Sequence, residues 1–279
     1  MKKFAEMIAK EINDNRDGYN SQTLEVVKIN DEKLVGVIVR KDGNNGGCVN
    51  YIDEDLMKNA SVMECADMFI RNVKVDKDVE LAKKEFEWND VKNLITMRLV
   101  NTEYNTEFLA DKVHKDLGNG LSMMFDITTD EYNAAITTAL ADKLGIDELM
   151  LVCASQISDA GTPILYDMAE ALFVNEPTNF LEGDVTSHSS MLVLKTRDKF
   201  GASAIYRGGV AEKIKKVVGD YYLLPSSVCE WIVVPKSSGI EVDALKDMVY
   251  EANRTVVDKC DLLSDGVYEW AEDGVKRIA

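Results

Sequence analysis

The chain has 279 residues, 46% hydrophobic and 29% charged, which is typical of a globular protein with its own core. Its formal net charge of −17 would repel a phosphate backbone, so we expect no direct binding of nucleic acid. The longest apolar run, Leu149–Ala154, is too short to cross a bilayer and indicates a buried helix face, so we expect no membrane association.

The start of the chain and its cysteines predict a cytoplasmic protein. Glu6 and Glu11 interrupt the apolar stretch that a signal peptide needs. The cysteines are odd in number, form no C-x-x-C pair and have no zinc-like spacing to a histidine. We therefore expect reduced thiols, no metal site and no cofactor. The cysteines are Cys48, Cys65, Cys153, Cys229 and Cys260.

The first part of the chain is predicted to be rich in helices. An amphipathic helix begins near Phe4 and ends before Gly18, and a hairpin follows with strands at Leu24–Ile29 and Leu34–Val39. A glycine-rich hairpin loop at 43–47 leads to a short strand, Cys48–Ile52. Further helices are predicted at Ser61–Asn72, Val79–Phe86, Asp90–Val100 (with Asp90 as its cap and Leu94, Ile95 and Leu99 inward) and Tyr104–Lys112, with His114 in a helical setting.

The middle of the chain is predicted to mix strands and helices. Leu121–Ile127 indicates a strand that pairs with Ala134–Thr137. A helix at Asp147–Ile157 is expected to turn Leu149, Val152 and Cys153 inward, and Pro163 is expected to begin another helix that ends near Phe173. The stretch Asn175–Ser190 indicates an exposed connection.

The last ninety or so residues give the clearest pattern. Strands are predicted at Met191–Lys195, Ala202–Tyr206, Tyr221–Leu224, Glu230–Val234 and Gly266–Trp270, and helices at Gly208–Val218 and Val242–Asn253. Short connections between these elements are typical of an α+β fold with a largely antiparallel sheet. We predict a helix-rich N-terminal region, 1–118, and a C-terminal α+β region, 119–279, with one continuous domain as the alternative.

The turn from Ser226 to Glu230 is the most distinctive candidate for chemistry. Ser226, Ser227, Cys229 and Glu230 bring two hydroxyls, a thiol and a carboxylate together between two strands. A nucleophilic Cys229 would need a base to lower its pKa, and the local sequence supplies no histidine. The structural alternative is that the serines satisfy the backbone of the turn while Cys229 is buried.

Two further groups of residues are candidates for anion binding. Arg207, Gly208 and Gly209 open a predicted helix, where backbone N–H groups and a guanidinium favour an anion. The alternative is that the glycines only let the strand turn into the helix. Arg254 is a second cation for an anionic substrate of the Ser226–Glu230 turn.

Histidines and carboxylates give less specific signals. His114 is expected to be solvated, and His188 lies among serines without a G-x-S-x-G motif. Asp126 and Glu230 stand at predicted strand ends that suggest partial burial, where a carboxylate serves as an acid or base or is tied to an amide or an arginine.

Several segments resemble a bacterial family known only as a domain of unknown function. They are 144–149, 201–206, the Leu223–Glu230 stretch with its Leu-Pro-Ser-Ser turn, 245–249, Asn253-Arg254-Thr255 and 263–268. The resemblance spans most of the chain and is weakest at its start. It implies a protein of gut anaerobes and mobile elements, and it brings no reaction, ligand or cofactor. The family's turn usually has a histidine where this chain has Cys229. If that histidine is catalytic in the relatives, the resemblance argues against catalysis in this chain.

Three functions are consistent with these patterns. We favour an acidic cytoplasmic binding or regulatory protein, encoded by a mobile element and acting on a basic host protein. The alternatives are an enzyme of unknown class, with an anionic substrate at the Ser226–Glu230 turn, and a self-associating structural protein. We expect no catalytic residues if the favoured function holds.

Overall fold

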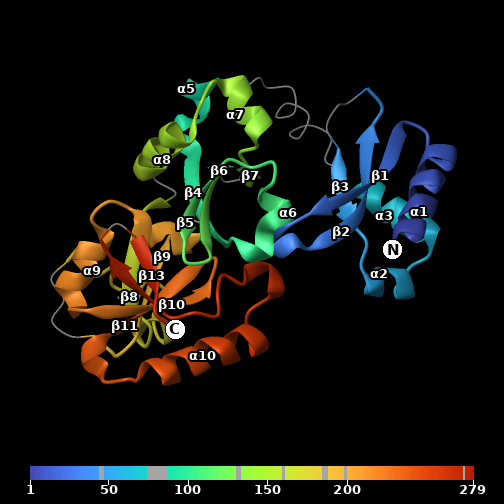
Figure 1. Cartoon of the computed structure of the whole chain (residues 1–279). Coiled ribbons are helices and arrows are strands. Elements are labelled where there is room, and N and C mark those ends of the chain that lie inside the picture. The colour runs from blue at the N-terminus through green and yellow to red at the C-terminus, as the bar shows by residue number, and fades with distance from the viewer. Residues whose placement is uncertain are drawn as a thin grey trace. The chain divides into compact units, whose positions relative to one another are not determined.

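A computed structural model describes residues 1–43, 47–73, 87–129, 133–158, 161–183, 188–197, 200–272 and 274–279 (Figure 1). The described chain divides into two compact units, 1–86 and 87–279. The boundary predicted at 118/119 instead falls in the turn between two paired strands, where Gly118 is opposite Leu121. The predicted helix 79–86 and the centre of the 43–47 loop lie outside the described residues.

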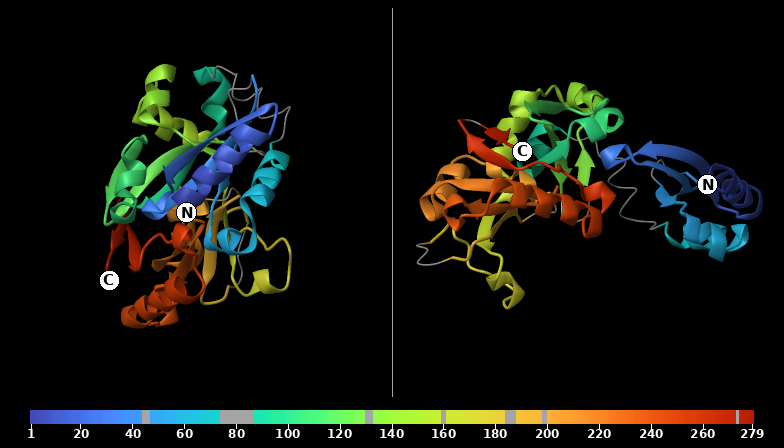
Figure 2. Two further views of the ribbon diagram at one scale, coloured as in Figure 1. Left: turned by 90° about the vertical axis from the view of Figure 1, so that its right-hand side faces the viewer. Right: turned by 60° about the horizontal axis from the view of Figure 1, so that its bottom comes forward.

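The N-terminal unit is a three-stranded antiparallel sheet with helices packed on one face (Figure 2). Its elements are α1 (Lys2–Asn15), β1 (Tyr19–Val27), η1 (Ile29–Asp31), β2 (Lys33–Lys41), β3 (Cys48–Tyr51), α2 (Glu54–Asn59) and α3 (Val62–Arg71). Helix α1 packs against α3 and against strands β1 and β2. The buried side chains are Ala5, Ile8, Ala9, Ile12, Val37, Val39, Ile52, Cys65, Ala66 and Phe69. Their helical and alternating spacing explains why α1, β2, β3 and α3 were predicted from the sequence, whereas α2 and η1 were not and β1 begins at Tyr19 instead of Leu24.

The C-terminal unit begins with a four-stranded antiparallel sheet in which β4 and β5 flank β6, and β7 also pairs with β6. Its elements are α5 (Trp88–Val91), η2 (Lys92–Leu94), β4 (Ile95–Asn101), η3 (Glu103–Asn105), α6 (Thr106–Leu109), β5 (His114–Gly118), β6 (Leu121–Thr128), β7 (Asn133–Ala135), α7 (Thr138–Leu144) and α8 (Glu148–Ile157).

The helix predicted at 90–100 is wrong over most of its length. Every residue of β4 is buried, and the strand pairs along its whole length with β6. A strand buried on both faces loses the alternation of polar and apolar residues, so its apolar residues also fit a helical spacing. His114 likewise lies on strand β5 and not in a helix.

A six-stranded antiparallel sheet, in the order β13-β12-β10-β11-β9-β8, forms the rest of the unit. Its elements are β8 (Pro163–Asp167), η5 (Glu170–Leu172), β9 (Leu192–Thr196), η6 (Gly201–Tyr206), α9 (Val210–Val218), β10 (Tyr221–Ser227), β11 (Glu230–Pro235), η7 (Lys236–Ser238), α10 (Val242–Thr255), η8 (Lys259–Asp261), β12 (Tyr268–Ala271) and β13 (Gly274–Arg277). The α+β class is therefore confirmed.

Two predictions within this unit are wrong for local reasons. Pro163 begins strand β8, a position that tolerates proline because the missing N–H costs least at the start of an edge strand. The predicted strand at 202–206 is the 3₁₀ helix η6. Helix α8 is confirmed, but Leu149 is 69% exposed, and Leu151, Ala154 and Ser155 face inward.

The two faces of the six-stranded sheet are packed differently. On one face the fully buried Trp231 packs edge-on against Tyr268, with ring centroids 5.6 Å apart, and donates its Nε1–H to the Ala202 carbonyl at 2.6 Å. The other face carries Leu224 and Val234 against Leu245 of α10, the long helix that crosses this face in Figure 1. That second face also carries the candidate site.

Candidate functional site

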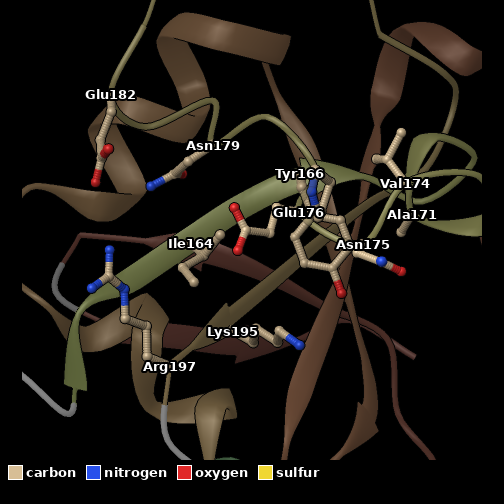
Figure 3. A pocket seen from close by; sticks show the side chains of 11 residues that line it. Ile164, Tyr166, Ala171, Val174, Asn175, Glu176, Asn179, Glu182, Lys195 and Arg197 are labelled. Atoms are coloured by element: carbon tan, nitrogen blue, oxygen red, sulfur yellow. The ribbon is translucent and has the colours of Figure 1, made fainter.

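A cavity of about 610 Å³ lies beside strands β8 and β9 (Figure 3). We call it the Tyr166 pocket, after the aromatic side chain on its floor. Its volume is within the ~300–1,000 Å³ typical of ligand-binding pockets. It is lined by Ile164, Tyr166, Ala171, Val174, Asn175, Glu176, Pro177, Asn179, Glu182, Lys195 and Arg197.

Strand register sets the floor of the pocket. Ile164 is opposite Lys195, and Tyr166 is opposite Val193, so these side chains share one face of the sheet. Arg197 follows Lys195 by two positions and reaches the same cavity. The intervening Leu165 and Leu194 are fully buried on the opposite face.

The side chains of Tyr166 and Lys195 form a cation–π contact that restricts both of them. Tyr166 is only 8% exposed, and the Lys195 ammonium lies 5.6 Å from the centroid of its ring. A cation above an aromatic face is attracted by the ring quadrupole. Burial, and to a lesser degree the charge of Glu230, raise the pKa of Tyr166, so its hydroxyl stays protonated at neutral pH.

The opposite wall is the connection from Asp167 to Glu182, and a carboxylate holds its beginning. Asp167 accepts hydrogen bonds from the backbone N–H of Ala169 at 2.8 Å, of Glu170 and of Ser189. Burial alone would raise the pKa of Asp167, but these donors outweigh burial and lower it. The wall therefore depends on an ionised carboxylate.

Two further contacts fix the rest of this wall. Glu170 Oε1 accepts from the Thr178 hydroxyl at 3.0 Å. Asn179 Oδ1 accepts from the N–H of Leu165 at 3.1 Å, and the Phe180 N–H donates to the Leu165 carbonyl at 2.7 Å. The backbone N–H and C=O of Leu165, on the outer edge of strand β8, are thus both hydrogen-bonded to the wall of the pocket.

Four charged side chains face the cavity from two sides. Lys195 and Arg197 project from the strand β9 side, and Glu176 and Glu182 from the connection (Figure 3). Within the described ranges, none of the four forms an ion pair. The pocket therefore offers both signs of charge to a ligand, over a floor of Ile164 and Tyr166.

The predicted Ser226–Glu230 turn lies outside the lining of this pocket, and both of its serines form hydrogen bonds within the turn. The Ser226 hydroxyl donates to Glu230 Oε1 at 3.3 Å, and Ser227 Oγ accepts from the Cys229 N–H at 3.0 Å. Cys229 is half-buried. Ser227 therefore satisfies the backbone of the turn, whereas Ser226 bonds a side chain and Cys229 is not fully buried, so the structural alternative matches only in part. The charge of Glu230 contributes to the raised pKa of Tyr166.

Neither histidine is hydrogen-bonded to the Ser226–Glu230 turn in the part of the chain that the structure describes. His114 Nδ1 contacts the Lys112 carbonyl, and His188 Nδ1 contacts the Ser189 carbonyl. Both histidines are exposed. The described residues also contain no group of three or more potential metal ligands.

The predicted anion site at Arg207 is used differently by the fold. The Arg207 guanidinium donates to the carbonyls of Gln156 and Ser158, the latter at 2.6 Å, at the C-terminal end of α8. The Gly208 N–H donates to Gln156 Oε1 at 3.0 Å, and Gly209 supplies a left-handed N-cap with φ of 78°. These groups join α8 to the start of α9, as expected for cations near a helix C-terminus.

Arg254 and Asp126 also have structural partners. Arg254 lies over the Tyr250 ring of its own helix, 3.4 Å from the centroid, and is not part of the pocket lining. Asp126 is fully buried and accepts two hydrogen bonds from Arg98, at 2.9 and 2.7 Å. Asp126 is therefore the carboxylate tied to an arginine that the sequence offered as an alternative.

The lining residues of the Tyr166 pocket could not be identified from the sequence. Lys195 stands at the end of a predicted strand, while Glu176, Asn179 and Glu182 fall in a predicted exposed connection. One usable signal was present. Lys195 and Arg197 stand two residues apart, after apolar Val193 on the same strand face, so two cations follow an otherwise apolar face.

Comparison with known proteins supports a single family assignment. The sequence model described as "Family of unknown function (DUF5688)" matches residues 1–272. No curated protein and no solved structure matches the chain. In the described residues, no helix is both long enough and apolar enough to span a membrane. The resemblance to a family of unknown function is thus confirmed, and the chain belongs to the family DUF5688.

Proposed function

We propose that this protein is an acidic cytoplasmic binding protein that recognises a basic protein partner through the Tyr166 pocket. The observation that carries the proposal is the open cavity, which Glu176 and Glu182 line without an ion-pair partner among the described residues. Carboxylates left available at a cavity favour a cationic group from outside. Regulation of a host protein by a mobile-element product is the biological setting that we propose for this binding.

The charge distribution supports the same proposal. Residues 87–279 contain 18 Lys and Arg against 32 Asp and Glu, whereas residues 1–86 contain 14 against 17. The acidity is thus concentrated in the unit that holds the pocket. A field of this sign accelerates encounter with a basic surface and weakens as salt increases.

The pocket lining favours binding over catalysis. Among the described lining residues, the only hydroxyl belongs to Tyr166, whose raised pKa disfavours the phenolate. The hydroxyls and thiol of the Ser226–Glu230 turn lie outside the lining. A general acid or base acts together with a nucleophile or a second titratable group within hydrogen-bond reach. Among the described residues, the four charged side chains of the lining form no ion pair with one another.

The test is affinity capture from host lysate at salt concentrations below and above about 0.15 M, read by mass spectrometry. We expect a stoichiometric basic protein that is lost at high salt. The variant Glu176→Gln/Glu182→Gln should lower its recovery roughly tenfold.

A matched control removes the same charge elsewhere. Glu241 and Glu251 are exposed residues at helix α10, and Glu241→Gln/Glu251→Gln should capture the partner as the wild type does. Equal recovery by the wild type and the pocket variant would show that the partner binds elsewhere. Capture of no basic protein at either salt concentration would overturn the proposed function.

A further inference from the structure

The two walls of the Tyr166 pocket carry opposite charges. A ligand with a single cationic side chain would form ion pairs with the acidic wall only. Lys195 lies on strand β9 and Arg197 directly follows the end of that strand, and both line the same side of the cavity. Glu176 and Glu182 lie on the connection that forms the other wall. A ligand that satisfies both walls must carry an anion and a cation.

We propose that the pocket takes the carboxy-terminal end of a polypeptide. The terminal carboxylate binds Lys195 and Arg197, and a Lys or Arg side chain two residues before the end binds Glu176 and Glu182. The inference rests on the proposed function and specifies which part of the basic partner enters the site.

The carboxylate is matched by the cations of strand β9. The guanidinium of Arg197 presents donors in a planar fork that suits a carboxylate, and Lys195 adds a second charge. The Tyr166 ring beneath the Lys195 ammonium limits the freedom of that side chain. Less conformational entropy is therefore lost when the anion binds.

The hydrogen bonds at the outer edge of strand β8 favour a ligand that ends in the pocket over an internal peptide segment that would pair with this strand. A passing segment recognised as an added strand needs free backbone groups on the sheet edge. The N–H and C=O of Leu165 are already used by Asn179 and Phe180. A chain end needs no such edge and leaves the pocket wall intact.

The remaining lining suits the side chain and backbone of such a ligand. Ile164, Val174 and Pro177 provide apolar surface for the terminal side chain. The amide groups of Asn175 and Asn179 also line the cavity, where side-chain amides can both donate to and accept from peptide groups.

The test uses labelled peptides and the full-length protein. The probe is fluorescein-Gly-Ala-Lys-Ala-Leu with a free carboxylate, compared with the same peptide ending in an amide and with a version carrying Gln for Lys. Binding is measured by fluorescence anisotropy. We expect the free acid to bind best, and either change in the peptide to weaken binding about tenfold, as the loss of a charge-assisted contact does.

Protein variants assign each effect to its wall. Lys195→Gln/Arg197→Gln should bind the free acid and the amide equally, and Glu176→Gln/Glu182→Gln should no longer distinguish Lys from Gln in the peptide. Lys213→Gln/Lys246→Gln, which alters exposed lysines on helices α9 and α10, should behave as the wild type. Circular dichroism verifies that each variant is folded.

The two proposals fail in different ways. Equal binding of the free acid and the amide by the wild type would overturn the chain-end inference. If the lysate partner is nevertheless captured, and is lost from the Glu176→Gln/Glu182→Gln variant, the proposed function stands with a different recognised segment. A peptide that binds all variants equally would place the interaction outside the pocket and also overturn the inference.

Discussion

The two units of the chain bury different kinds of side chain. In the described part of residues 1–86, Asn50 is the one buried polar residue, and the core is otherwise apolar. The C-terminal unit buries many polar groups, including the Arg98–Asp126 pair, Asn101 and Asn105. An apolar core is stabilised by burial that is not directional, whereas a buried polar network depends on each partner being present. The C-terminal unit should therefore be more sensitive to single polar substitutions.

Tryptophan provides a way to follow one unit alone. Trp88, Trp231 and Trp270 are the three tryptophans of the chain, and all belong to residues 87–279. Tryptophan fluorescence therefore reports the C-terminal unit, while hydrogen exchange read by mass spectrometry resolves both units segment by segment.

The largest effect is expected from Asp126→Ala. The substitution removes the carboxylate from the buried Arg98, whose guanidinium lies 3.4 Å from the Phe200 ring centroid. Loss of one partner of a buried pair costs about 3–5 kcal/mol, so the urea midpoint of the fluorescence transition should fall sharply.

The double variant Arg98→Met/Asp126→Leu removes both charges and should lose less stability than Asp126→Ala. Exchange protection should decrease in strands β4 and β6 and stay unchanged in α1. An equal decrease in α1 would show that the chain unfolds as one continuous domain.

A smaller effect is expected from Asp167→Ala, which takes an acceptor away from three backbone N–H groups in the pocket wall. Leaving buried donors unsatisfied costs about 1–3 kcal/mol. Because the folded pKa of Asp167 is lowered from its ordinary 3.8, the ionised carboxylate stabilises the folded state. This contribution is complete above the unfolded pKa and is lost as the pH falls through the lower folded pKa.

Thermal unfolding between neutral and acidic pH measures this contribution. The difference in stability between wild type and Asp167→Ala should be largest at neutral pH and should shrink in acid. Neither Asp167→Asn nor Asp167→Ala carries an ionisable group at this position. The difference in stability between these two variants should therefore not change with pH. A difference that grows with acidity would contradict the sign of the pKa shift.

The smallest effect is expected in the N-terminal unit, from Ser61→Ala. Ser61 Oγ accepts from the Glu64 N–H, and the Glu64 side chain accepts from the Ser61 N–H, which forms a capping box at the start of α3. Loss of the cap costs about 1 kcal/mol. Exchange protection should fall in α3, with Ser61→Thr as the conservative control, and tryptophan fluorescence should not change. A shift in the fluorescence transition would reveal coupling between the units.

Local signals were enough to predict elements whose surroundings are simple. The α1 helix and the β1–β2 hairpin each have one buried face, so their spacing of apolar residues identifies both the element and its orientation. The two strands of the β10–β11 hairpin were likewise predicted, although Pro225, Ser226 and Ser227 belong to β10 and the turn consists of Val228 and Cys229. In such elements the sequence pattern and the tertiary packing agree.

Elements determined by distant partners could not be predicted in the same way. Strand β4 is defined by its pairing with β6, twenty or more residues later in the chain, and local propensity did not distinguish it from a helix. The Tyr166 pocket depends on the pairing of Ile164 with Lys195 and on the return of Asn179 to Leu165. Those contacts have no signature in a single sequence. The partners of Arg207 likewise could not be predicted, because the carbonyls of Gln156 and Ser158 lie about fifty residues earlier.

The closed edge of strand β8 has a consequence for the behaviour of the protein at high concentration. An unpaired edge strand can template the strand of a neighbouring molecule, which begins aggregation. Asn179 and Phe180 occupy the Leu165 backbone groups on which such templating would depend. The same short segment therefore lines the pocket and occupies backbone groups of the strand edge. A substitution of Asn179 would change the pocket lining and leave the Leu165 N–H open to another strand at the same time.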